Sequence, residues 1–386
     1  GRLKTPRVRV EGKDYAEAVA NMNTLFLRNL WGDGLPLLPP TKERVSWILR
    51  GTDISPDAEI GRIMPKGGIA TVETLAVSLA MAGGRPEYLP VLIAAVEAIL
   101  EPGLSHDKWQ TTSSSIYPVV IVNGPIAKQI RLNSGFGLLG PDPQHPAGGS
   151  IGRAIRLLQQ NAGGALPGVG TMSMFGGMRY TNAVFAEDEA GLPPGWEPLN
   201  VEYLGYPKGV NTVAVSPVSS ATNILRRGVG KETLDEEALT SLHIIASYMR
   251  SFNVNSFDGY ANGTPGILLI SSTVDGQLAS LGWMKEKIRE FLWEKSKIPL
   301  SELKGTGFIR WIEHSNLKET LQDPWPVTSK PENLMIVVAG GRHPTHAYWM
   351  QSAMAPRVAS AEIKLPANWD ELIKEAEENL GPLPVN

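Results

Sequence analysis

The chain has 386 residues, of which 42% are hydrophobic and 19% are charged, and its formal net charge is -3 at pH 7. This length and composition allow one large core or two ordinary ones and are not typical of a disordered or fibrous protein. The slightly acidic balance gives no basic field for nucleic acid, and no apolar stretch reaches the ~20 residues that a membrane span requires.

The sequence contains no cysteine. Its absence excludes thiolate nucleophiles, zinc-thiolate sites and iron-sulfur clusters ligated by the protein, so redox chemistry would need a borrowed cofactor. No signal peptide is visible. We therefore expect a soluble, cytoplasmic protein with a small-molecule substrate, no nucleic acid and no membrane partner.

The first part of the chain, 1–115, is predicted to be a helical N-terminal layer. Apolar residues recur at helical spacing over 14–30, 41–49, 71–82 and 86–100. Thr41 is a suitable N-cap after two prolines, and Pro86 suits a first helical turn.

From residue 116 onward, short β-branched runs alternate with helical stretches. Strands are predicted over 117–122, 181–186, 212–215, 266–270 and 335–338, helices over 151–160, 235–250 and 369–380, and a helix-turn-helix over 272–294. This pattern predicts an α/β fold with a buried mixed or parallel sheet covered by helices. The strand order does not follow from the sequence, and the strands are too dissimilar to be identified as repeats.

A break is predicted over 226–234, where Gly228 and Gly230 precede the next helix. It separates an α/β half over 116–230, which contains a glycine-rich binding loop, from a second α/β half over 231–386. Ligands of open α/β sheets bind outside the carboxyl ends of the strands. The loops after the strands, beginning with Asn123, are therefore the expected binding edge.

The glycine-rich run after Asn133 and Ser134 is the densest candidate for a binding site. Gly149 and Ser150 stand before the predicted helix 151–160, whose free N–H groups and dipole could hold an anion, and Arg153 could complete a fork on it. The alternative is that these glycines only permit a tight, buried loop. The dinucleotide fingerprint and the P-loop are both absent, so no cofactor is identified.

Candidate proton-transfer residues follow two of the strands. Glu187 and Asp188 stand after the strand 181–186, and since neighbouring strand residues point to opposite faces, at most one of them is directed inward. His343 and His346 flank Pro344 after the last predicted strand. They suit general acid or base work better than metal binding, because the proline and the lack of an adjacent glutamate weaken a metal interpretation, and no metal site is assigned. The remaining alternative is that they are surface histidines of a loop.

A serine hydrolase is a minor alternative. His106 and Asp107 precede a hydroxyl-rich run over 111–115, from which a Ser-His-Asp set could be assembled. The Gly-x-Ser-x-Gly nucleophile elbow is absent, and hydroxyl-rich strand entries are commonly turns.

Six strings of the sequence resemble an uncharacterised bacterial protein family. They are WGDGLPLLPPT over 31–41, AMAGGRPEYLPVLIAAVEAI over 80–99, IVNGP over 121–125, NSGFGLLGP over 133–141, SIGRAIRLLQQNAGG over 150–164 and FAEDE over 185–189. The resemblance implies association with small thioredoxin-like or selenoprotein partners that carry a Sec-Gly-Ser-Cys (UGSC-type) motif. It selects positions rather than a reaction, and the matched polar residues are Arg85, Glu87, Asn123, Asn133, Ser134, Arg153 and Glu187.

The sequence departs from that family at three informative places. Gly84 stands where the family often has cysteine, Ala147 to Ser150 replace an Ala-Asn-Ala-Thr run, and Asp275 or its neighbours replace a histidine. A thiol-dependent activity is therefore not expected of this chain.

Our leading hypothesis is an enzyme that acts on a small, anionic organic molecule and cleaves or adds across a carbon-heteroatom bond, as a hydrolase or lyase. Arg153 would bind the anion, the loop amides would stabilise developing negative charge, and Glu187, His343 or His346 would move the proton. One alternative is a non-catalytic or half-site subunit of a hetero-oligomer, whose small partner brings a redox thiol, selenol or metal. A homo-oligomer and a plain small-molecule binding protein remain open as well.

Overall fold

The computed structural model describes residues 6–179, 181–226, 232–250, 265–315, 318–353 and 358–383, and its N-terminal layer is helical as predicted. The hydroxyl of Thr41 caps the second helix by accepting from the Arg44 amide. A small antiparallel hairpin, which was not predicted from the sequence, lies between the second and third helices. The elements are α1 (Tyr15–Asn29), α2 (Lys42–Ile48), β1 (Glu59–Ile63), β2 (Gly68–Thr71), α3 (Val72–Met81), the 3-10 helix η2 (Pro86–Tyr88) and α4 (Leu89–Ile99).

The rest of the chain builds one large sheet, which confirms the α/β fold. It is a mixed sheet of seven strands, curled into a half-barrel, within the described part of the chain. Its order is β4-β3-β5-β8-β6-β7, and β9 pairs with β5. The strands are β3 (Tyr117–Asn123), β4 (Ala183–Ala186), β5 (Thr212–Leu225), β6 (Gly266–Ile270), β7 (Met335–Val338), β8 (His346–Ser352) and β9 (Ala359–Glu362).

The two ends of this sheet have the same topology. β3 is parallel to β4 and antiparallel to the first part of β5, just as β6 is parallel to β7 and antiparallel to β8. Each of these three-strand units is extended by a strand from the other half of the chain. β9 pairs with the first part of β5 in the first unit, and the last part of β5 pairs with β8 in the second. The two α/β halves therefore share one continuous sheet.

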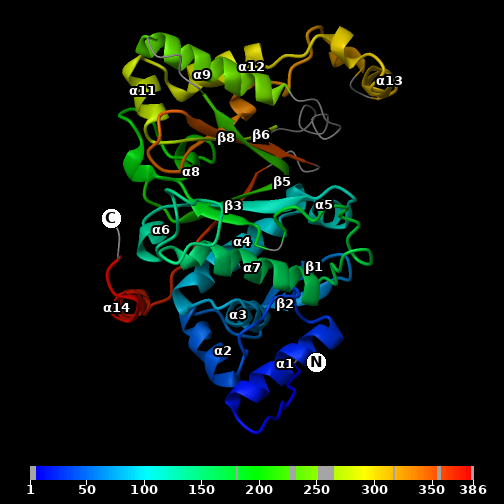
Figure 1. Cartoon of the computed structure of the whole chain (residues 1–386), viewed down its shortest axis with the longest axis vertical. Helices are drawn as coiled ribbons and strands as arrows, with labels where there is room; N and C mark the ends of the chain where they lie inside the picture. The colour runs from blue at the N-terminus through cyan, green and yellow to red at the C-terminus, as the bar shows by residue number, and fades with distance from the viewer. Residues whose placement is uncertain are drawn as a thin grey trace.

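Helices pack on the outside of the curled sheet at both of its ends: α4 and α7 lie against β3, β4, β5 and β9, and α9 lies against β5 and β8. Figure 1 shows α1, α2 and α3 beyond α4 and α7, and α11 and α12 beside α9 on the opposite side. Gly228 and Gly230 of the predicted break lie outside the described residues. None of the helices in the described ranges combines the length and apolarity needed to cross a bilayer. The remaining helices are α5 (His106–Thr111), α6 (Ile126–Gln129), α7 (Pro146–Asn161), α8 (Leu199–Glu202), α9 (Leu234–Met249), α11 (Val274–Ser280), α12 (Lys285–Lys295), α13 (Phe308–Glu313) and α14 (Trp369–Leu380).

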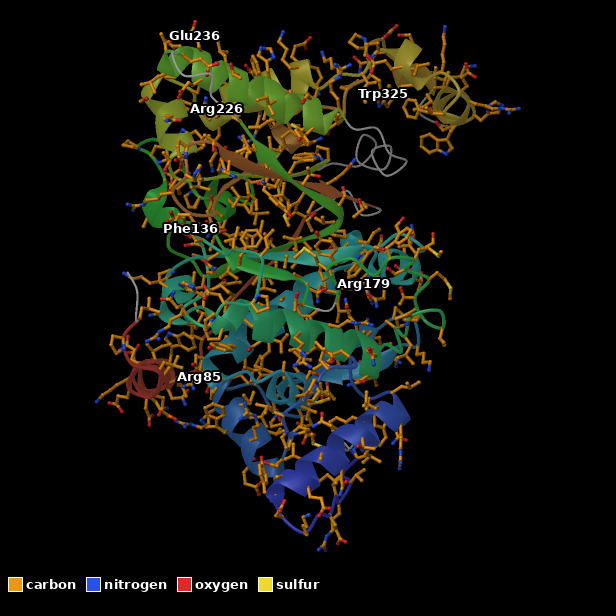
Figure 2. All side chains as sticks on the ribbon, in the orientation of Figure 1. Arg85, Phe136, Arg179, Arg226, Glu236 and Trp325 are labelled. Carbon is orange, nitrogen blue, oxygen red and sulfur yellow. The ribbon has the colours of Figure 1, made fainter. Side chains whose placement is uncertain are left out.

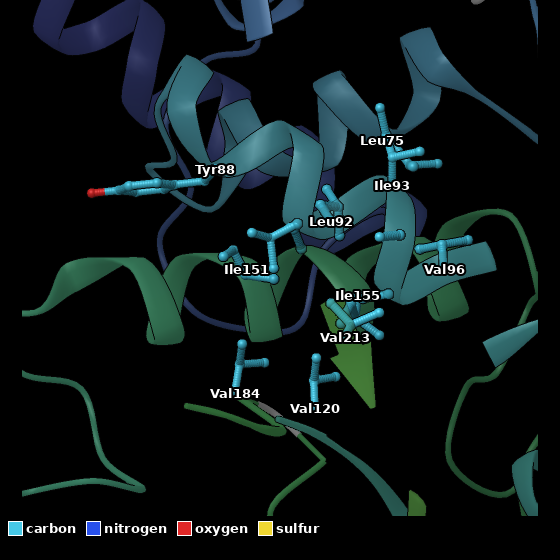
Figure 3. Packing of buried hydrophobic residues seen from close by; sticks show 14 of the residues in the cluster. Leu75, Tyr88, Leu92, Ile93, Val96, Val120, Ile151, Ile155, Val184 and Val213 are labelled. Atoms are coloured by element: carbon cyan, nitrogen blue, oxygen red, sulfur yellow. The ribbon is translucent and has the colours of Figure 1, made fainter. Parts of the chain in front are cut away.

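Four strands, β3, β4, β6 and β7, are buried on both faces, because the curled sheet encloses a core of its own. Alternate residues of β3 and β6 point inward into a shared cluster, whereas the residues between them face the covering helices. Figure 3 shows Ile151 and Ile155 of α7 against Val120 and Val184 of the sheet. This double burial explains why the strands read as continuous apolar runs. The inward residues are Val119, Ile121, Ile267 and Leu269, and the outward ones are Val120, Val122, Leu268 and Ile270.

α7 is longer than predicted and approaches β4 very closely. It begins at Pro146 instead of residue 151, because proline fits the first helical turn. A Cβ on Gly152 would lie 1.8 Å from the Thr181 carbonyl oxygen, and one on Gly148 would lie 2.4 Å from that of Val184. These two glycines therefore allow helix-sheet contact and are not part of a ligand loop.

Candidate functional site

The carboxylate of Glu187 is the centre of a buried polar cluster at the carboxyl ends of the strands. It follows β4, and its Oε2 accepts hydrogen bonds of 2.7 Å from both Asn123 Nδ2 and the Leu199 amide. Its Oε1 lies 3.4 Å from the Val338 amide, at the end of β7. The side chain is fully buried, and it joins the ends of β3, β4 and β7.

A buried cation partly balances this carboxylate. Lys285 Nζ lies 3.8 Å from Glu187 Oε1 and 3.0 Å from Glu202 Oε2, and it donates to the Glu197 carbonyl at 2.7 Å. Arg289 also pairs with Glu202. Burial raises the pKa of Glu187, and the opposing effects of Lys285 and of the hydrogen bonds do not reverse that direction.

Two further acids extend the cluster towards solvent. Asn123 Nδ2 also donates to Glu189 Oε1 at 3.1 Å, and the Gly124 amide donates to the same oxygen at 2.6 Å. Asp188 is half-buried and accepts from the Gly191 amide. Its own amide donates to the Val338 carbonyl at 2.8 Å. Of the adjacent pair at the end of β4, Glu187 is thus directed inward and Asp188 lies at the solvent side.

The second half of the sheet contributes an acid of unusual proton affinity. Asp275, in the first turn of α11, is fully buried, and its Oδ1 accepts from the Gly276 amide at 2.5 Å. Burial raises the pKa of Asp275 to about 7, and the negative charge of Asp188 acts in the same direction. Near neutral pH, this carboxyl can both give and take a proton.

Three buried polar atoms of the cluster have no hydrogen-bond partner among the described residues. They are Asn123 Oδ1, Ser272 Oγ and Asp275 Oδ2. Buried polar groups are nearly always paired, so such atoms call for an explanation by a ligand, a water molecule or a catalytic role. Ser272 follows β6 and lies close to Gly191, beside Asp188. The unpaired atoms therefore surround the same strand ends as the carboxylates.

The glycine-rich loop lies across the carboxyl end of β7. The Asn133 side chain holds the loop in a turn, since its Nδ2 donates to the Phe136 carbonyl and its Oδ1 accepts from the Gly135 amide, both at 2.8 Å. The Ser134 carbonyl accepts from the Gly340 amide at 2.9 Å. Figure 2 shows Phe136 at this side of the molecule. Asn133 and Ser134 thus lie at the expected edge, although the amide of Asn133 is occupied within its own turn.

Arg153 was expected to bind an anionic ligand, but its guanidinium is bonded within the protein. Its Nε and one terminal nitrogen bind the Asp33 carboxylate at 2.7 and 3.0 Å, and that nitrogen also donates to the carbonyls of Leu35 and Pro36. The Asp33 side chain is 3% exposed. Arg153 therefore fastens the segment before α2 to α7.

We expect Arg153→Ala to lower the free energy of unfolding by about 3 kcal/mol, because a buried carboxylate would lose its partner. Urea denaturation of this variant, with the exposed Arg28→Ala as its control, measures the effect. Unchanged stability together with loss of ligand binding would instead support the anion-binding role.

Four other predicted positions lie away from the acid cluster or within secondary structure. Gly149 and Ser150 lie inside α7, which begins before them. Arg85 and Glu87 form an ion pair of 2.5 Å at the start of η2, in the N-terminal layer. Figure 2 places Arg85 close to α14. The structure does not bring Arg85 and Glu87 together with Glu187.

The two histidines stand at the junction of β7 and β8. His346 is the first residue of β8, and His343 precedes it in an exposed turn. The carbonyl of His343 accepts from Ser271 Oγ at 2.5 Å, which places this turn beside the end of β6. His106 of the serine-hydrolase alternative accepts from the Met64 amide through its Nε2, at 3.1 Å.

Asp275 and Lys285 are two members of the cluster that the sequence analysis did not select as site residues, as are Ser272, Glu189, Glu202 and Arg289. An acid in the first turn of a helix after a buried strand was the available signal for Asp275, since such a position lies at the ligand-binding edge. Nothing in the sequence indicated that Lys285 is buried, because a lysine that begins an amphipathic helix is commonly solvated. Only the chain topology brings it against Glu187.

Comparisons with known proteins add no relative. The sequence matches no protein-family model, no curated protein and no solved structure.

Proposed function

We propose that the protein is an enzyme that binds a small organic molecule at the carboxyl ends of β3, β4 and β6. There it would cleave or add across a carbon-heteroatom bond, as a hydrolase or lyase. The observation that supports this most is Asp275, a fully buried carboxyl whose Oδ2 has no partner within the described residues and which interacts with the charge of Asp188. Such unpaired, electrostatically coupled acids are typical of catalytic sites.

The residues of the cluster suit different roles. Asp275 is the proton donor and acceptor, because its pKa of about 7 matches neutral pH. Asn123 Oδ1, which is unpaired, would accept a hydrogen bond from the substrate. Both oxygens of Glu187 are already bound by protein donors, so we assign it to holding Asn123 in position.

The charges of the cluster favour a neutral or cationic substrate over the anionic one expected from the sequence. Arg153, the predicted anion ligand, is paired with Asp33. Lys285 and Arg289 are paired as well, and the acids outnumber these two cations. A substrate with N–H or O–H donors complements this acidic cluster better than a carboxylate or phosphate does. The acids are Glu187, Asp188, Glu189, Glu202 and Asp275.

An activity screen of the purified chain tests this proposal. The panel contains small amides, esters, amines and alcohols, and turnover is followed by proton NMR. We expect Asp275→Asn to lower kcat/KM for any converted compound by roughly a hundredfold or more, and the exposed Asp370→Asn to leave it unchanged. Full activity of Asp275→Asn would contradict the proposed role, and a panel without turnover or saturable binding would contradict the proposed function.

A second function, as a subunit of a larger assembly, is favoured by one exposed apolar loop. Val169, Met172, Met174 and Phe175 are all exposed, and Phe175 reaches 93%. The loop is held in place by backbone bonds of 3.2 Å to Thr111 and 3.0 Å to Ser113. Fixed apolar side chains of this kind commonly mark an interaction surface. Arg179, labelled in Figure 2, follows this loop, and its buried guanidinium donates to the Thr171 hydroxyl at 2.6 Å and to the Trp109 carbonyl at 3.0 Å.

We expect the purified protein to self-associate through this loop, and Phe175→Ser to shift it towards the 41.8 kDa monomer. Sedimentation velocity measures the shift, and Leu239→Ser, on exposed α9, is the matched control. A wild-type protein that sediments as a monomer, or a Phe175→Ser variant that sediments like the wild type, would contradict self-association by this surface.

A further inference from the structure

Three side-chain atoms converge in the turn between β7 and β8. His343 Nδ1 and His346 Nδ1 lie 2.9 Å apart, and Thr345 Oγ1 lies 3.0 Å from each of them. The two imidazole rings are nearly perpendicular, with their centroids 4.5 Å apart. The three atoms thus form an almost equilateral triangle of potential ligands.

The edges of this triangle match one face of a metal coordination shell. Histidine nitrogens bind first-row transition metals at about 2.0–2.1 Å, so two ligands at right angles in a six-coordinate shell lie about 2.9 Å apart. All three edges are within 0.1 Å of that separation. A single ion above the triangle would contact both nitrogens and the hydroxyl at normal distances.

The turn is held rigidly on both sides. Ser271 Oγ donates to the His343 carbonyl at 2.5 Å, and the Arg226 amide donates to the Thr345 carbonyl at 2.9 Å. His346 is fixed further by its pairing with Leu225 in the sheet. Ligands held by surrounding hydrogen bonds lose little freedom when an ion binds, which favours binding.

The site is open to solvent, and a nearby positive charge is balanced by neighbouring carboxylates. His343 is exposed, and Thr345 and His346 are half-buried, so an ion can enter and keep water ligands. The nearby Arg226 guanidinium is paired with Glu232 and Glu237, which offsets its repulsion of a cation. No three His, Asp or Glu side chains converge in a metal-binding arrangement among the described residues, so the hydroxyl and water complete this site.

We propose that His343, Thr345 and His346 bind one divalent transition-metal ion, such as Zn²⁺, through Nδ1, Oγ1 and Nδ1. Two imidazoles select zinc, cobalt, nickel or copper over magnesium and calcium, which prefer oxygen ligands. The site does not involve Asp275 or Glu187, so it is independent of the proposed enzymatic function. It lies beside the end of β6, where an ion would add a positive charge near the acidic cluster.

Isothermal titration of the untagged, chelator-treated full chain with zinc chloride tests the site. We expect saturable binding of one ion per chain, weakened roughly tenfold or more in both His343→Ala and His346→Ala. Thr345→Val should weaken it less, because only the hydroxyl ligand is replaced. His314→Ala is the control, since this exposed histidine directly follows α13 and its Nδ1 lies against the Arg310 carbonyl.

Cobalt substitution supplies a second readout that does not depend on affinity. Weak visible absorption bands, typical of a six-coordinate ion, should appear with the wild type and disappear in His343→Ala, whose exposed position keeps the fold intact. Absence of saturable zinc binding by the wild type would overturn the proposal. So would binding that survives both histidine substitutions, or that is lost on replacing His314 instead.

Discussion

Asp275→Asn is expected to stabilise the protein above neutral pH and to flatten the dependence of its stability on pH between about 4 and 7. Burial raises the pKa of Asp275 from 3.8 to about 7 in the folded chain. Between these values, the folded state keeps a proton that the unfolded state releases. The carboxyl therefore makes the wild type less stable as pH rises through this window, and the whole loss is present above pH 7.

The size of this effect follows from the difference in pKa. A rise of the pKa from 3.8 to about 7 lowers the free energy of unfolding above pH 7 by about 4 kcal/mol. Asparagine should recover a large part of this loss, because it stays neutral at every pH. Urea denaturation from pH 4 to pH 9 measures it, with the exposed Asp370→Asn as the control. An Asp275→Asn variant that is less stable than the wild type at pH 8 would show that the ionised carboxylate is stabilising, against the burial observed.

Activity and stability of the same variant should move in opposite directions. A residue in the first turn of α11 that destabilises the fold near neutral pH is consistent with a functional role, because active sites commonly reduce stability. A variant that is both more stable and inactive would fit this interpretation. A variant that is more stable and fully active would show that Asp275 destabilises the fold without taking part in catalysis.

Gly152→Ala is expected to lower the free energy of unfolding by about 3 kcal/mol or more, because a densely packed interface cannot accept the added atom without moving. The new Cβ would lie 1.8 Å from the Thr181 carbonyl oxygen, so α7 and β4 would have to separate. Asn182, whose side chain donates to the Gly152 carbonyl at 2.9 Å, would lose its alignment as well.

Gly149→Ala is the matched control in the same helix. Its Cβ would meet Pro141 at 3.8 Å, an ordinary contact, and alanine in a helix interior is more favourable than glycine by about 0.5–1 kcal/mol. The two glycines are three residues apart, so thermal denaturation should show opposite shifts within one turn of helix. Equal destabilisation by both substitutions would refute the assignment of the clash to Gly152.

Regular elements with a strong local signal could be predicted from the sequence. β6 and β7 occupy the predicted ranges, and α14 begins and ends where its amphipathic pattern does. β5 is much longer than the predicted 212–215, because its second part has polar and exposed residues that only pairing with β8 orders. β8 was missed because its polar ends lack the continuous apolar run of the other strands.

The candidate site could be predicted only as an edge of the sheet. Asn123 and Glu187 lie together at this edge, where a residue that directly follows a strand is expected. The cation that partly balances Glu187 is Lys285 of α12, 98 residues further along the chain, and no local sequence pattern predicts such a contact. Arg153 was placed on the right helix, but the sequence could not show that Asp33 lies opposite it.

The exchange of strands between the two ends of the sheet has a consequence for synthesis. The first part of β5 has β3 on one side and β9 on the other, and β9 begins only at Ala359. The ribosome must therefore make almost the whole chain before this part of the sheet is complete. Until then, the first part of β5 exposes unpaired backbone groups, and open edges of this kind promote aggregation. Shortened chains that end before β9 should therefore accumulate as insoluble protein instead of as a folded N-terminal half.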